Sequence, residues 1–315
     1  MRDSRNSDQK AEQVNVLLFD DFSNHCLANA IEPFRAANSL SHKVLYQWRF
    51  YTPQGTSVAS SSGLQISPDG PISDARGEML IVMPSYRFRS HAVWDNTRKL
   101  KAAATRHKIL VGLDTGSWLL ANAGLLDGYR ATIHWEELTP FAEAFPDVQA
   151  ARERFVIDGD RITCSGAMAT YDLVLHLISK AHGPFLAMEV EQLFMSIGSA
   201  GTRGSAPNPT GRIVQKAIVV MQENLEEPLR LADVAKRAGA TQKTLEQRMQ
   251  LEMKATPQSV YRRLRLILAR KLALETDHPV AEIAGRCGYE NASAMTRAFK
   301  AEFRVTLRDL RKQAG

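Results

Sequence analysis

The residues best placed to do chemistry lie in one short turn. Residues 109–118 read ILVGLDTGSW, an apolar run followed by a small-residue turn that opens with Asp114 and then by the start of a helix. Such a turn exposes its side chain and directs backbone N–H groups toward a reacting oxygen, so many α/β enzymes place a nucleophile there. A carboxylate is a poor nucleophile for acyl transfer. Asp114 therefore has two open interpretations: a cap of the helix that begins near Ser117, or a ligand for a cation.

The C-terminal third contains a repeated pattern of helices. Residues 231–239 (LADVAKRAG) place apolar side chains on one helical face, Gly239 permits a turn, and Thr241 can cap a second helix. The same pattern returns over residues 280–299, with Gly288 at the turn. Each copy predicts a helix-turn-helix with a small alanine where the two helices cross.

The elements that hold these residues fall into two domains. The chain has 315 residues; residues 212–315 carry a net charge of +8 and the remainder −2, so a polyanion partner is expected for the C-terminal third alone. Residues 198–211 (GSAGTRGSAPNPTG) predict a linker, because they are rich in turn-forming residues. Residues 1–13 are polar and predict a disordered tail, and no apolar run reaches the length of a membrane span.

Between the tail and the linker, β-like runs alternate with helical patterns, which predicts a parallel sheet with helices on both faces. The expected strands are residues 14–19, 46–52, 79–83, 109–113 and 130–133, with a hairpin over 154–164. The expected helices lie near residues 26–38, 95–107, 171–182 and 184–197. Two more are expected between them, one that begins at residue 117 and a separate one that ends at residue 145. After the linker only helices are expected, with a long one over 258–276 between the two helix-turn-helix copies.

The cysteines offer no site for a metal. Cys26, Cys164 and Cys287 are far apart and form neither a CxxC pair nor a Cys/His spacing typical of metal binding. They are expected to be buried free thiols in a reducing cytoplasm. We therefore expect no metal and no cofactor.

Residues 212–312 resemble the DNA-binding domain of AraC/XylS-type transcription regulators. The matching stretches are LADVA at 231–235, TP at 256–257, YRRLRL at 261–266, IAGRCGY at 283–289 and TRAFKAEF at 296–303. In that family the second helix of each motif enters the major groove of double-stranded DNA. The resemblance implies that exposed residues of these helices contact the DNA. The residues expected to read bases are Gln242, Lys243, Glu246, Gln247, Asn291, Ser293, Thr296 and Arg297. Lys300 is expected to lie toward phosphate. Arg262, Arg263 and Arg265 are expected to touch phosphate or acidic partners.

Several positions depart from that family's pattern. Gln247 stands where the family usually has arginine, and Thr306-Leu307 replaces a common Ser/Pro-Pro pair. Lys254 and Arg304 stand where glycine usually ends the second helices. Glycine is favoured there because it enters the left-handed region without strain, so the two cations are expected to do so at some cost.

Residues 14–197 resemble the class I glutamine amidotransferase-like superfamily in its PfpI-like branch. The matching stretches are IEPFRAAN at 31–38, DTG at 114–116, AGLLDG at 123–128, ATIHW at 131–135, SG at 165–166 and DLVLH at 172–176. That branch is joined to an AraC-type domain in the GlxA-type regulators. The whole chain is thus expected to be an α/β flavodoxin-like sandwich for ligand sensing and dimerisation (14–197), a linker (198–211) and an all-α domain with two helix-turn-helix motifs (212–315).

The resemblance also shows which enzymatic features are missing. Asp114 occupies the position of the catalytic cysteine, although His134 matches the family histidine. Pro84-Ser85 replaces a loop that is often Gly-Gly, and proline has no N–H to donate. Cys26 falls near the place where the enzymes carry an acidic residue. We therefore expect no enzyme activity; a residual PfpI-like enzyme tethered to DNA is the alternative.

The former active site becomes the expected ligand pocket. Trp118 and Trp135 could present aromatic faces to a quaternary ammonium or guanidinium group beside Asp114, although either tryptophan is also typical of a core. The expected ligand-binding residues are Asp114, Thr115, Trp118, His134, Trp135, Tyr86 and Glu32. Similar regulators include sensors of arginine, carnitine and betaines, which implies a small cationic, nitrogenous effector.

These patterns together predict a cytoplasmic transcription regulator that binds promoter DNA in response to a small molecule. The resemblance implies an activator that contacts RNA polymerase and forms a homodimer, with no membrane partner. A DNA-binding protein that responds to no ligand remains an alternative interpretation.

Overall fold

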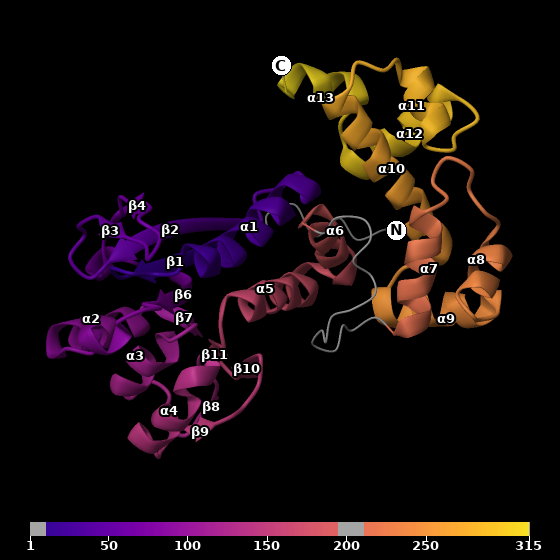
Figure 1. Ribbon diagram of the computed structural model, residues 1–315. Helices are drawn as coiled ribbons and strands as arrows, with labels where there is room; N and C mark the ends of the chain where they lie inside the picture. The colour runs from indigo at the N-terminus through magenta and orange to yellow at the C-terminus, as the bar shows by residue number, and fades with distance from the viewer. Residues whose placement is uncertain (1–10, 195–210, 315) are drawn as a thin grey trace, which may run out of the picture. The chain divides into compact units, whose positions relative to one another are not determined.

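The computed structural model describes residues 11–194 and 211–314, which divide into two compact units (Figure 1). Unit 1 comprises the described residues up to His182 and residues 186–194; unit 2 comprises residues 183–185 and 211–314. Apart from Gly211, the predicted linker lies outside the described residues, as do residues 1–10 of the predicted tail. None of the helices in the described ranges is both long enough and apolar enough to cross a membrane.

A seven-stranded sheet forms the centre of unit 1. Its strands lie in the order β10 (Phe155–Asp158), β11 (Arg161–Cys164), β7 (His107–Leu113), β6 (Gly77–Met83), β1 (Glu12–Leu18), β2 (Tyr46–Thr52) and β5 (Gly70–Pro71). All neighbouring strands are parallel except the β10–β11 hairpin. Parallel strands covered on both faces have nearly continuous apolar sequences, which is why the central strands can be recognised in the sequence. The predicted α/β class is confirmed.

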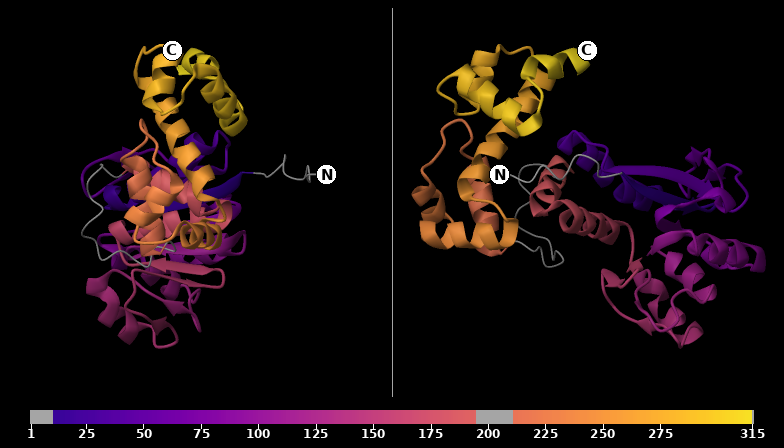
Figure 2. Two further views of the ribbon diagram at one scale, coloured as in Figure 1. Left: turned by 90° about the vertical axis from the view of Figure 1, so that its right-hand side faces the viewer. Right: turned by 180° about the vertical axis from the view of Figure 1, so that it is seen from behind.

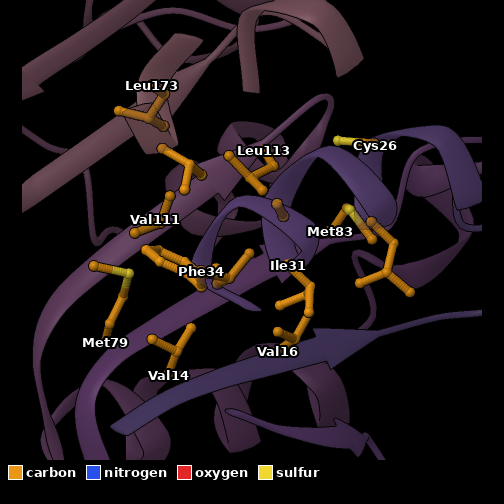
Figure 3. Packing of buried hydrophobic residues seen from close by; sticks show 14 of the residues in the cluster. Val14, Val16, Cys26, Ile31, Phe34, Met79, Met83, Val111, Leu113 and Leu173 are labelled. Atoms are coloured by element: carbon orange, nitrogen blue, oxygen red, sulfur yellow. The ribbon is translucent and has the colours of Figure 1, made fainter. Parts of the chain in front are cut away.

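Helices cover both faces of this sheet. One face carries α1 (Asn24–Ser41), α5 (Ala167–His182) and α6 (Pro184–Phe194); the other carries α2 (Trp94–Ala104), α3 (Gly116–Asn122) and α4 (Leu138–Ala144). Side chains alternate along each strand, so Val16 of β1 packs in the first core and Leu17 in the second. Figure 3 shows the first core, in which Ile31 and Phe34 of α1 pack among side chains of the strands.

Some short elements differ from the prediction. The strand expected at 130–133 is only β8 (Arg130–Ala131), which pairs with β9 (Gln149–Ala150) outside the main sheet. The pairing of β8 with β9 ends after Ala131, because the next backbone N–H, that of Thr132, donates to the Thr163 side chain instead. Strand β1 begins at Glu12, inside the predicted tail. The remaining short elements are β3 (Val58–Ala59), β4 (Gln65–Ile66), and the 3-10 helices η1 (Ile72–Asp74), η2 (Phe88–His91) and η3 (Trp135–Glu137).

The regular secondary structure in the described residues of unit 2 is all helical (Figure 2). Its helices are α7 (Arg212–Gln222), α8 (Leu231–Arg237), α9 (Gln242–Met253), α10 (Pro257–Glu275), α11 (Val280–Arg286), α12 (Ala292–Phe303) and α13 (Leu307–Ala314). The pairs α8–α9 and α11–α12 are the two predicted helix-turn-helix motifs, and α10 joins them. Gly239 and Gly288 make the two turns with φ of +80° and +68°. A Cβ on Gly288 would also lie 2.5 Å from Pro228, so the second turn requires glycine.

The ends of α10 are closed by side chains. Thr256 and Ser259 form a capping box at its first turn. At its last turn, the Arg311 guanidinium of α13 donates to the carbonyl oxygens of Ala273, Thr276 and His278. These carbonyls have no partner within the helix, so Arg311 fixes the C-terminal end of α10.

Candidate ligand cavity and nucleic-acid interface

The turn at Asp114 has a backbone that few residues adopt. Asp114 lies between β7 and α3 with a φ of +60°, in the left-handed region. Gly116 follows at the start of α3, where a Cβ would come within 2.0 Å of the Val82 carbonyl oxygen. The strand, the turn and the helix are therefore packed too closely for any other residue at 116. Strained backbone of this kind gathers at functional sites.

Asp114 does not cap the helix that follows it. The N-cap position of α3 is Thr115, and no side chain accepts a hydrogen bond from the first turn of this helix. The Thr115 hydroxyl instead donates to the Ser85 carbonyl oxygen at 2.7 Å. The interpretation of Asp114 as a hydrogen-bonding helix cap is therefore wrong; Asp114 precedes the N-cap residue and lines a cavity.

The cavity has a volume of about 760 Å³ and lies beyond the carboxyl ends of β6 and β7. Parallel sheets commonly place ligand sites at this edge. Three segments line it: the loop after β6, the turn after β7 and the stretch at η3. The lining residues are Ser85, Tyr86, Arg87, Phe88, Arg89, Ser90, Asp114, Thr115, His134, Trp135, Glu136 and Glu137.

Burial of its carboxyl raises the pKa of Asp114 above the ordinary value. The Ser85 hydroxyl and His134 act in the opposite direction and lower it. The His134 N–H donates to the Asp114 carbonyl oxygen at 3.0 Å, which fixes the two segments against each other. The net result is a carboxyl held partly out of water, whose charged form a bound cation would stabilise.

Other charged residues that line the cavity form ion pairs that do not include Asp114. Arg87 pairs with Asp21, and Arg89 pairs with Glu137. His134 lies 3.6 Å from Glu136. Among the described residues Asp114 takes part in no ion pair, so it is the lining carboxylate available to a ligand cation.

Five of the seven predicted ligand residues line the cavity: Tyr86, Asp114, Thr115, His134 and Trp135. Trp118 does not, because its ring packs against Phe88 and Phe145 and the Arg89 guanidinium lies 4.5 Å from its centre. Glu32 does not either; it lies on α1 and pairs with Arg35 at 2.6 Å. These two predictions are wrong.

Ser85, Arg87 and Arg89 are lining residues that the sequence prediction missed. In the sequence, the Pro84-Ser85 loop stands out only for the N–H that proline lacks. Ser85 is in fact only 4% exposed, and its hydroxyl has no hydrogen-bond partner among the described residues.

Cys26 is fully buried and lies near the Asp114 carboxyl. Burial, and next the nearby Asp114 carboxyl, raise the pKa of the Cys26 thiol well above its ordinary value. Its sulfur lies 3.4 Å from the Thr170 hydroxyl. A thiol acts as a nucleophile only as the thiolate, so Cys26 is inert in this setting.

The predicted base-reading residues lie on α9 and α12. Gln242, Lys243, Glu246, Gln247, Ser293, Arg297 and Lys300 are exposed, and Thr296 is partly exposed. The Gln242 side-chain amide donates to Glu246 at 2.9 Å. Asn291 differs from the prediction, because its side-chain oxygen caps α12 by accepting from the Ala294 N–H at 2.8 Å.

Two of the three arginines expected at phosphate are internal to unit 2. Arg263 pairs with Glu302. Arg265 donates to the carbonyl oxygens of Cys287 and Gly288, at 2.6 and 2.5 Å, at the second helix-turn-helix turn. Only Arg262 of the three is exposed. Arg263 thus pairs with an acidic side chain, which is the second of the two alternatives predicted for it, whereas Arg265 binds backbone carbonyls and neither alternative holds for it.

The two cations at the ends of α9 and α12 adopt the backbone expected of glycine. Lys254 and Arg304 are the C-cap residues, with φ of +52° and +62°. The sequence prediction that they enter the left-handed region is confirmed. Each carries the strain of a Cβ in that region.

Comparison with known proteins gives two family matches. Residues 12–180 match the DJ-1/PfpI family, and residues 234–313 match a helix-turn-helix domain. The chain is 36% identical to the HTH-type transcriptional regulator CdhR of Pseudomonas aeruginosa, over 91% of this chain and 88% of that one. It is 31% identical to the HTH-type transcriptional regulator GlxA of Rhizobium meliloti, over 99% of this chain and 98% of that one. A crystal structure of an AraC family transcriptional regulator from Pseudomonas putida matches 58% of this chain and all of its own, with a TM-score of 0.51 and 25% identity.

Proposed function

Because the chain belongs to the DJ-1/PfpI family and carries an AraC-type helix-turn-helix domain, as HTH-type transcriptional regulators do, we propose that it regulates transcription in response to a small cationic metabolite. The observation that carries the effector part is the cavity wall at Asp114. A partly buried carboxyl that takes part in none of the ion pairs of the described residues supports the proposal of a binding site for a cation. A nitrogenous effector with a positive charge would complement the negative charge of the Asp114 carboxylate.

The proposed partner of unit 2 is double-stranded promoter DNA. The exposed Arg297 of α12 can take guanine with two hydrogen bonds, and Glu246 of α9 can accept from cytosine. Arg262 and Lys300 are exposed cations suited to phosphate. Base contacts would set specificity, and the phosphate contacts would set the salt dependence of binding.

We propose that unit 1 is not an enzyme. Three observations support this: the elbow carries Asp114, the nearby Cys26 is buried as a thiol, and Pro84 offers no N–H beside the cavity. His134 then has no nucleophile to activate, since an aspartate elbow is already deprotonated or, when protonated, unreactive toward acyl groups.

The mode of regulation is also proposed from the family. The chain acts as a cytoplasmic homodimer that activates transcription through RNA polymerase, and the effector changes how the DNA-binding units are presented. Such a change requires the effector to bind two states of the protein with different affinity.

Thermal unfolding of the full chain with a panel of cationic metabolites tests the effector. At about 100 times its dissociation constant, the effector should stabilise unit 1 by roughly 2.7 kcal/mol. Asp114→Asn should abolish this shift, and asparagine tolerates the left-handed backbone. Stabilisation that survives in the variant would exclude Asp114 as the anchor. No stabilisation and no change in DNA affinity with any metabolite would favour a ligand-independent DNA-binding protein.

DNA binding is tested separately with Arg297→Ala. This change should weaken binding by about 1–3 kcal/mol and relax the base preference at one position. Turnover of an amide or glyoxal that is lost in Asp114→Asn would instead support the enzyme alternative.

A further inference from the structure

The wall of the cavity beside Asp114 contains a second polar group, the Ser85 hydroxyl. Ser85 is 4% exposed, and its Oγ has no hydrogen-bond partner of ordinary length among the described residues, although it lies close enough to the Asp114 carboxyl to lower the pKa of that carboxyl. A buried polar atom without a partner is unfavourable, so such atoms are rare and call for a physical explanation. Since Ser85 lines the cavity, its hydroxyl can donate toward the Asp114 carboxyl while its oxygen accepts a hydrogen bond from a bound molecule.

The backbone holds this hydroxyl in place. Ser85 has a φ of +57°, a conformation that serine adopts only under constraint. The Thr115 hydroxyl donates to the Ser85 carbonyl oxygen at 2.7 Å, and the backbone N–H of Tyr86 donates to the Asp21 carbonyl oxygen at 3.3 Å. Ser85 is thus fixed between the turn that carries Asp114 and the loop after β1. The hydroxyl and the carboxyl form one rigid polar wall.

The aromatic side chains of the cavity are poorly suited to a quaternary ammonium group. Such a group is held by aromatic faces that are shielded from water. Tyr86 and Trp135 line the cavity but are 59% and 68% exposed. The ring of Trp118 already carries the Arg89 guanidinium.

We infer that the cavity selects a cation that carries N–H groups, a protonated amine or a guanidinium, and that Ser85 is the residue that makes this selection. One N–H donates to the Asp114 carboxylate and another to the Ser85 hydroxyl. A quaternary ammonium has the same charge but no N–H, so it leaves both acceptors unpaired. This inference rests on the proposed effector site and narrows its ligand class.

Calorimetric titration of the full chain with three probes tests the inference. The probes are butylamine, butylguanidine and butyltrimethylammonium at equal ionic strength, which share a chain and a charge and differ in N–H content. Wild type should bind the first two at least tenfold more tightly than the third. Ser85→Gly removes the hydroxyl and suits the left-handed backbone, and Ser85→Ala keeps the Cβ. Both should bind the N–H probes about tenfold more weakly and leave binding of the trimethyl probe unchanged.

Ser90 provides a matched control. It lines the same cavity, but its hydroxyl already donates to the Arg87 carbonyl oxygen at 2.8 Å. Ser90→Ala should therefore leave the binding of all three probes unchanged. An equal loss in Ser90→Ala and Ser85→Ala would overturn the role of Ser85.

The remaining outcomes separate this inference from the proposed function. If butyltrimethylammonium binds as tightly as butylamine and Asp114→Asn abolishes both, the cation site stands and the selection for N–H groups is wrong. If Ser85→Gly binds butylamine as wild type does, Ser85 is not the selecting residue. If no probe binds in an Asp114-dependent way, the cation site and the selection both fail.

Discussion

Replacing Arg265 by methionine should destabilise unit 2 by about 3 kcal/mol. The guanidinium on α10 donates to the Cys287 and Gly288 carbonyl oxygens and lies 4.1 Å from the centre of the Tyr289 ring. Hydrogen bonds from a charged group contribute roughly 1.5–3 kcal/mol each, and an exposed cation–π contact about 0.5–1 kcal/mol. Arg265 is only partly buried, so the lower end of the range applies to each hydrogen bond, and the two bonds together contribute about 3 kcal/mol; we expect methionine to keep a contact with the Tyr289 ring in place of the cation–π contact. Methionine keeps most of the apolar stem and removes the donors.

The positions of the tryptophans allow each unit to be followed by itself. The four tryptophans lie at or before residue 135, in unit 1, and the sequence after residue 211 contains none. Tryptophan fluorescence therefore reports unfolding of unit 1, while far-ultraviolet circular dichroism also reports the helices of unit 2. For a domain of this size, the Arg265→Met transition seen by circular dichroism should fall by roughly 12–24 °C. The fluorescence transition should not move.

Arg262→Met is the matched control. Arg262 lies on the same helix but is exposed, so its loss should change stability by less than about 0.5 kcal/mol. It should weaken DNA binding through a lost phosphate contact and reduce the salt slope by about 1. Equal stability of the two variants would show that Arg265 does not hold the second turn, and the reasoning from its hydrogen bonds would be refuted.

Three further predictions concern backbone strain and pH. Asp114→Asn should stabilise unit 1 at neutral pH: burial raises the pKa of Asp114, so its contribution to stability is full at low pH and is lost as the pH rises through the folded-state pKa. A fluorescence-monitored melt at pH 7 that shows a lower midpoint in the variant would contradict this. Lys254→Gly and Arg304→Gly should each stabilise unit 2 by about 1 kcal/mol, because glycine adopts the left-handed backbone of the C-cap without strain. Urea unfolding followed by circular dichroism measures this, and unchanged midpoints would argue against strain at these two positions. Burial lowers the pKa of His107 below its ordinary 6.5, so its contribution is present above that pH and is lost as the pH falls. His107→Gln should reduce part of the stability loss measured as the pH falls below 6.5, and an unchanged dependence of stability on pH would exclude this histidine as a cause.

The sequence was sufficient for the main strands and for the repeated helical motifs. Strands β1, β6 and β7 are buried on both faces, and the apolar runs that result are visible without any partner. The turn glycines of unit 2 and the left-handed C-caps follow from local backbone preferences. By contrast, β8 has only two residues, and its length is set by where Thr132 finds a hydrogen-bond partner far along the chain.

The errors at Trp118 and Arg265 have the same cause, which is a contact with a distant segment of the chain. Trp118 and Trp135 are the same residue type near the same turn, yet Arg89 and Phe145 cover only Trp118, and both come from distant segments. Arg265 looks like a surface cation on α10 because the carbonyls it binds are twenty or more residues away. Asn291 is different, since an asparagine before a helix is a local capping signal that could have been recognised.

The rigidity of α10 has a consequence for the evolution of the promoters that this protein would read. The helix has 19 residues, roughly 28 Å, and its first and last turns are both closed by side chains. A base pair inserted between the stretches read by α9 and α12 would shift one of them by about 3.4 Å and rotate it by roughly 35°. Because α10 is rigid, the two recognition helices that it joins cannot follow that displacement. Such binding sites would diverge by base substitution, while single-base insertions and deletions between the two stretches would be eliminated by selection.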